Sequence, residues 1–170
     1  MPATVNQRSV ASVSTESVHE ALDLALRRVV VQDVALLRGD SSERSICFRL
    51  ALYLVELFRD FDVDCEYNRL WNAQDEIKRL IHTKHTEYSR YVSGDHGDSF
   101  TVYPDIIIHR RGTDDNLLII EVKKTSSDIP VAFDHYKLTL YKQQLSYRHA
   151  AFIRFDVFPH DPGIAELRYF

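Results

Sequence analysis

The sequence predicts an α/β fold in which a mixed central sheet is flanked by helices. Two runs rich in Ile and Val, at residues 102–109 and 117–122, have the composition of neighbouring β-strands. Two other stretches, at residues 43–58 and 134–147, place apolar residues at the spacing of an amphipathic helix. At 170 residues the chain is long enough for one substantial core, so we expect a single domain over residues 1–170.

The two Ile- and Val-rich runs predict a hairpin that carries three charged residues, Asp105, Glu121 and Lys123. Residues 110–116 separate the runs and contain one Gly and two Asp, which is typical of a turn. If the turn is centred near Thr113, Asp105 falls opposite Glu121 on the facing strand. Lys123 is two residues beyond Glu121 and therefore shares the same face of the sheet.

A bound divalent cation would resolve the charge conflict in this hairpin. Burying an unpaired charge is costly, and two close carboxylates repel unless a proton or a cation lies between them. A hard divalent ion takes oxygen ligands of this kind, and a lysine beside it can position or deprotonate a water molecule. Because a proline cannot donate a ladder hydrogen bond, we expect a bulge or bend at Pro104, next to Asp105.

The helix that begins near Asp40 adds a third carboxylate. Asp40 is the predicted N-cap, and Glu43, three residues later, completes a capping-box pattern. Glu43 also lies on the apolar stripe of this helix, which comprises Ile46, Cys47, Leu50, Leu54, Leu57 and Phe58. Two interpretations stay open: the capping box is the whole role of Glu43, or its carboxylate is also directed toward the sheet.

The remaining N-terminal segments are predicted to surround this core. We expect residues 1–17 to be a flexible arm and residues 18–30 to be a helix packed outside the main core. Residues 61–67 alternate between apolar and acidic side chains, which predicts a strand with one polar face.

Residues 69–98 are interpreted as an insertion near the substrate, with a short helix at residues 75–81. His82 and His85 are three apart, but no cysteine lies nearby, so we interpret them as surface residues rather than zinc ligands.

After the hairpin the sequence predicts a second helix, with Asp134 as its N-cap, and then strands at residues 149–155 and 164–170. Three residues share one face of this helix: Lys137, Tyr141 and Gln144. That face points either toward a phosphate backbone or, for Lys137 and Gln144, into solvent as an ordinary helix edge.

The composition excludes several classes of protein. The net charge is −4, so a nucleic-acid site has to be a local basic patch, assisted by metal. No run of about 18 apolar residues predicts a transmembrane helix, and the N-terminus lacks the pattern of a secretory signal. Cys47 and Cys65 are interpreted as reduced core residues. We therefore expect a cytoplasmic protein with no membrane association.

The order helix, strand, strand, strand, helix, strand, together with Glu43, Pro104-Asp105 and Glu121-Val122-Lys123, resembles the PD-(D/E)XK nuclease superfamily. Its best-known members are type II restriction endonucleases. The resemblance covers residues 40–155 and implies a restriction-endonuclease-like αβββαβ core, with the helix before residue 40 as an addition.

This resemblance implies Mg²⁺-dependent hydrolysis of phosphodiester bonds in nucleic acid, with DNA as the expected substrate and Mn²⁺ as a substitute metal. Asp105 and Glu121 match the metal-binding acids, and the carbonyl of Val122 is a further ligand. Lys123 matches the lysine that acts on the attacking water, and Glu43 the helix-borne acid that touches the metal through water. The residues expected to contact substrate are Lys124, Arg44, Tyr141 and Gln144.

Two other interpretations compete with a nuclease. One is a non-catalytic nucleic-acid-binding or interaction module on the same fold, since fold alone does not fix function. The other is a structural ion pair of Lys123 with Asp105 or Glu121, which leaves one acid unpaired. A homodimer would let two sites cut two strands.

Overall fold

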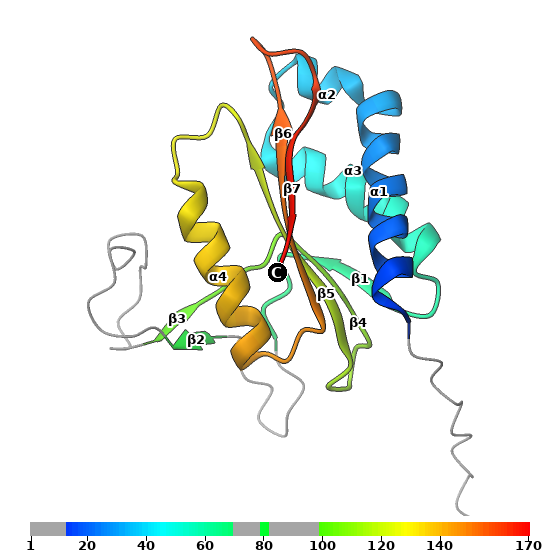
Figure 1. Cartoon of the computed structure of the whole chain (residues 1–170), viewed down its shortest axis with the longest axis vertical. Helices are drawn as coiled ribbons and strands as arrows, with labels where there is room; N and C mark the ends of the chain where they lie inside the picture. The colour runs from blue at the N-terminus through cyan, green and yellow to red at the C-terminus, as the bar shows by residue number, and fades with distance from the viewer. Residues whose placement is uncertain (1–12, 70–78, 82–98) are drawn as a thin grey trace, which may run out of the picture.

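The computed structural model describes residues 13–69, 79–81 and 99–170, and its centre is a five-stranded mixed sheet (Figure 1). The strand order is β1-β4-β5-β6-β7. The strands are β1 (Asp62–Cys65), β4 (Ile106–His109), β5 (Asn116–Lys124), β6 (His149–Asp156) and β7 (Gly163–Tyr169). β5 and β6 are parallel, whereas the other neighbouring pairs are antiparallel. β2 (Arg79–Ile81) and β3 (Ser99–Thr101) pair separately.

The helices cover both faces of this sheet, which confirms the α/β class (Figure 1). α4 (Val131–Gln144) connects the parallel strands β5 and β6 and packs on one face. There Leu138 and Tyr141 join a core with Ile107, Ile119 and Phe152. α1 (Thr15–Gln32), α2 (Val34–Arg38) and α3 (Glu43–Leu57) lie on the opposite side in Figure 1.

α1 belongs to the main core, so the expectation of a helix packed outside it is wrong. Its buried residues Val18, Leu22, Ala25, Leu26 and Val29 share one cluster with the buried residues of α3 and the sheet. The helix also begins at Thr15, capped by Ser14, so the expected flexible arm over residues 1–17 is wrong from Ser14 onward. The cause is β5, which is buried on both faces and therefore needs helices on both sides.

The starts of α3 and α4 both differ from the prediction. Ser42, not Asp40, caps α3: its hydroxyl accepts a hydrogen bond from the Ser45 N–H at 3.3 Å. α4 starts directly after Pro130, whose φ of −60° suits a helix start, and it ends at Gln144 rather than residue 147. Asp134 is consequently inside the first turn and does not cap the helix.

The hairpin is shorter on its first side than predicted. β4 begins at Ile106, so Pro104 and Asp105 precede the strand. The expected irregularity beside Pro104 is a bend at Asp105 rather than a bulge in the strand pairing. The register shift lies instead between Ile108 and His109, at the turn end. Pro104 avoids the ladder and accepts a hydrogen bond from the Glu66 N–H at 3.0 Å.

Three smaller points concern the rest of the chain. Residues 79–81 form a strand rather than the end of a predicted helix, while His82 and His85 lie outside the described residues. Cys47 is buried as expected, but Cys65 is exposed because it ends the edge strand β1; both are free thiols. Across the residues that the structure describes, no helix combines the length and apolarity needed to cross a bilayer.

Candidate active site

Asp105 and Glu121 meet at the end of the β4–β5 hairpin, as the predicted register requires. Ile106 pairs with Ile120 and Ile108 with Leu118, which centres the turn on Thr113. The residue before Ile106 is therefore opposite the residue after Ile120, and these are the two acids. Repulsion from the Glu121 carboxylate is one cause of the raised pKa of Asp105, so the two side chains are close enough to interact electrostatically.

β5 extends beyond the start of β4, and side-chain carboxylates complete its hydrogen bonds there. Asp105 Oδ2 accepts from the Val122 N–H at 2.7 Å. Glu43 Oε1, from the first residue of α3, accepts from the Lys124 N–H at 3.1 Å. Both N–H groups would otherwise lack a strand partner, because β4 pairs with β5 only up to Ile120. The Glu43 carboxylate is therefore directed toward the sheet, which was the second of the two interpretations of this residue.

The local electrostatics leave Asp105 short of positive charge. Burial and the nearby Glu121 carboxylate raise the pKa of Asp105 to about 8, although the Val122 N–H and the ammonium groups of Lys137 and Lys123 oppose this rise. A cation placed beside Asp105 would favour its ionised form. Burial also raises the pKa of Cys47, with the Asp105 charge as its next cause.

Glu121 is buried, with 2% of its surface exposed, and two groups from α4 bind it. The Tyr141 hydroxyl donates to Glu121 Oε1 at 3.0 Å, and Lys137 Nζ donates to Glu121 Oε2 at 2.6 Å. Burial raises the pKa of Glu121, and the Lys137 charge offsets only part of that rise. Burial and the Glu121 charge likewise raise the pKa of Tyr141, which stays a neutral donor.

Lys123 pairs with an acid that the sequence did not suggest. Its Nζ lies 3.1 Å from Asp134 Oδ2, and Asp134 Oδ1 lies 2.9 Å from Lys137 Nζ. The four charged groups Lys123, Asp134, Lys137 and Glu121 therefore form one buried chain of ion pairs. The proposed structural pairing of Lys123 with Asp105 or Glu121 is wrong, because its partner is on α4. A solvated helix edge at Lys137 is equally wrong.

The expected substrate-binding residues divide into two groups. Tyr141 is buried against Glu121, and Gln144 is exposed at the end of α4. Lys124 Nζ is 2.7 Å from Asp40 Oδ1, and Arg44 Nε is 2.7 Å from Glu66 Oε1. The charges of Lys124 and Arg44 are consequently already paired inside the molecule.

The candidate metal ligands are of the chemical type that a hard divalent ion prefers, but they are few. Asp105, Glu121 and the Val122 carbonyl supply oxygen only, which is the preference of Mg²⁺. Over residues 13–69, 79–81 and 99–170, no group of three or more His, Cys, Asp or Glu side chains is arranged to hold a metal. Mg²⁺ commonly uses one or two carboxylates and keeps several waters, so two acids are sufficient.

Sequence reasoning missed Asp134 and the site role of Lys137. One sequence pattern could have linked the two residues: oppositely charged residues three apart on a helix form an ion pair, as Asp134 and Lys137 do. Their meeting with Glu121 and Lys123 depends on how α4 docks on β5, which the sequence pattern does not specify.

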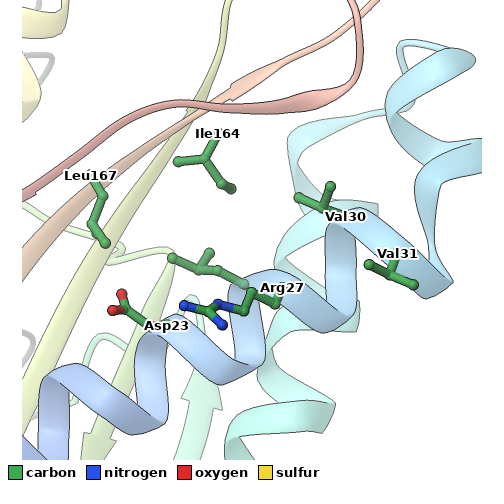
Figure 2. A pocket seen from close by; sticks show the side chains of 7 residues that line it. Asp23, Arg27, Val30, Val31, Ile164 and Leu167 are labelled. Atoms are coloured by element: carbon green, nitrogen blue, oxygen red, sulfur yellow. The ribbon is translucent and has the colours of Figure 1, made fainter.

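A separate groove of about 390 Å³ lies between α1 and β7 (Figure 2). Its lining is Asp23, Leu26, Arg27, Val30, Val31, Ile164 and Leu167. None of these residues is one of the charged residues Asp105, Glu121, Lys123, Asp134 and Lys137, so the groove is distinct from the candidate active site.

Comparison with protein-family models, with curated proteins and with solved structures found no match.

Proposed function

We propose that this protein is a metal-dependent nuclease that hydrolyses phosphodiester bonds in DNA, on a restriction-endonuclease-like core. The observation that supports this most directly is the convergence of Asp105 and Glu121 at the hairpin end, with Lys123 two residues further along β5. This is the acid, acid and lysine set on which the sequence resemblance to PD-(D/E)XK nucleases rests.

In this proposal Asp105, Glu121 and the Val122 carbonyl hold Mg²⁺ or Mn²⁺, with Glu43 nearby. The ion offsets the negative charge of the phosphate and lowers the pKa of a bound water. Asp105 supports the role because burial and Glu121 disfavour its charge unless a cation is close. Glu121 supports it less directly, because its two oxygens already accept bonds from Lys137 and Tyr141.

Lys123 is the group that acts on the attacking water in this proposal. Its ammonium is almost fully buried, and the ion pair with Asp134 fixes its position from α4. A cation held there favours a nearby hydroxide or a phosphate oxygen over their neutral forms. Because Lys124 and Arg44 are paired with Asp40 and Glu66, we do not assign phosphate binding to either of them.

The test is cleavage of single-stranded, double-stranded and branched DNA, and of RNA, with Mg²⁺ or Mn²⁺ present. Wild-type protein is expected to cut DNA, and Asp105→Asn or Lys123→Met is expected to abolish cutting. Asp105→Asn keeps an oxygen acceptor for the Val122 N–H, so it separates metal binding from folding. Asp114→Asn, in the exposed turn, is the matched control. Wild-type protein that leaves every substrate intact would count heavily against the proposal.

A non-catalytic binding module is a second candidate, and one contact favours it. Lys137 already neutralises Glu121 at 2.6 Å, which is what a site without metal would require. Calorimetric titration with Mn²⁺ discriminates the two candidates: heat that is lost in Asp105→Asn supports the nuclease, and absence of binding supports the module.

A further inference from the structure

We propose that Lys137 is an internal cation that competes with the metal ion for Glu121, and that Asp134 retains Lys137 when the metal binds. This inference rests on the proposed metal site and adds two α4 residues to it as positioning residues. Neither residue is among the ligands assigned above.

One ammonium group bridges two carboxylates in this region. Lys137 Nζ lies 2.6 Å from Glu121 Oε2 and 2.9 Å from Asp134 Oδ1. Release of Glu121 would therefore leave Lys137 still paired with Asp134, one turn earlier on the same helix. The movement costs one ion pair rather than the complete isolation of a buried charge, which would be far more expensive.

Asp134 is a buried carboxylate whose two oxygens face the two ammonium groups. Its side chain is 2% exposed, and its Oδ2 makes no hydrogen bond within the described part of the chain. Lys123 Nζ is within ion-pair distance of this atom, at 3.1 Å. Because Lys123 lies beside Oδ2, Asp134 holds Lys137 through its other oxygen, Oδ1.

The charge count gives the reason for competition. The carboxylates of Glu121 and Asp134 are already paired with the two ammonium groups of Lys137 and Lys123. A divalent ion bound to Glu121 would repel an ammonium on the same carboxylate. The metal therefore has to displace Lys137, and part of its binding free energy is used for that displacement.

The experiment is calorimetric titration of Mn²⁺ alone into wild-type protein and three variants at neutral pH. Lys137→Met removes the competitor, and its affinity for Mn²⁺ is expected to rise about tenfold or more, since ionic pairs of this kind contribute over 1.4 kcal/mol. Asp134→Asn weakens the retaining acceptor, so its affinity is expected to fall. Lys142→Met is the control, because this substitution removes the same positive charge from the same helix. Lys142 Nζ donates to the Phe170 carbonyl and not to Glu121.

The outcomes separate this inference from the proposed function. If wild type binds Mn²⁺ and Lys137→Met binds it equally or more weakly, the competition is refuted while the nuclease proposal stands. If neither binds, both proposals fail. If Lys137→Met does not fold, wild-type crystals soaked in Mn²⁺ decide: Lys137 Nζ should remain on Asp134 and leave Glu121, and a retained bond to Glu121 beside the ion overturns the inference.

Discussion

Asp105 accepts a hydrogen bond from the backbone N–H of Val122 at 2.7 Å, and so takes the place of a strand partner that β4 does not provide. Glu43 does the same for Lys124, two residues further along β5. Asp105 and Glu43, two of the three acids placed at or near the proposed metal site, are therefore also backbone acceptors. Substitutions that keep an oxygen acceptor can separate these two roles.

Replacing Glu43 by Ala is expected to destabilise the protein by about 1 kcal/mol, because the Lys124 N–H loses its acceptor in a half-buried position. Glu43→Gln retains an acceptor and should cost only a few tenths of a kcal/mol, from the lost negative charge at the start of α3. Urea unfolding measures both values. Equal losses in the two variants would show that the hydrogen bond does not stabilise the fold.

Tyr141→Phe removes one of the two donors to the buried Glu121 carboxylate. A buried acceptor that loses a partner costs about 1–3 kcal/mol, so a loss of that size is expected in thermal or urea unfolding. Tyr103→Phe is the matched control, because the Tyr103 side chain is 59% exposed. A Tyr141→Phe loss no larger than that of the control would contradict the hydrogen bond.

Asp64 is expected to make stability depend on pH. Burial would raise the pKa of Asp64, but hydrogen bonds from Arg111 and His109 outweigh burial and lower it below the ordinary value. A lowered folded-state pKa contributes stability above the unfolded-state pKa of about 4, and this contribution is lost as pH falls through the folded-state value. In urea unfolding across this range, the stability advantage of wild type over Asp64→Asn should shrink as the pH falls below about 4. An advantage that stays constant would refute the assignment.

Leu22→Ala tests the position of α1 in the main core. Leu22 is fully buried against α3 and the sheet cluster, so the cavity is expected to cost about 2–5 kcal/mol. Leu24→Ala, on the same helix but 49% exposed, should change the unfolding free energy by under about 0.5 kcal/mol. Similar small losses in both variants would place α1 outside the cooperative core.

The parts that sequence reasoning could reach are those set by local chemistry. The turn composition around Thr113 and the two apolar runs were sufficient to predict that Asp105 faces Glu121, and the paired residues Ile106 and Ile120 confirm this register. The Ser- and Asp-rich segment before Glu43 predicted a helix start, although the wrong residue as its cap.

The parts that it could not reach depend on docking between elements. Lys137 lies on the polar side of a helix stripe, where charged residues usually face water, and only the packing of α4 on β5 brings it to Glu121. The stripe of α1 predicted a helix but carried no information on which face of the sheet it would cover. Asp134 was predicted as an N-cap, but α4 begins directly after Pro130, which places Asp134 inside the first turn.

The tie between Glu43 and Lys124 also bears on the order of folding. It joins residues 81 positions apart, whereas the contacts of Glu121 with Lys137 and Tyr141 span 16 and 20 positions. Short loops close at a lower entropic cost than long ones, so the hairpin and α4 can assemble their part of the site first. We therefore expect the docking of α3 on β5 to be the slower, long-range step, in which the β5 end acquires its last acceptor when the two halves of the chain meet.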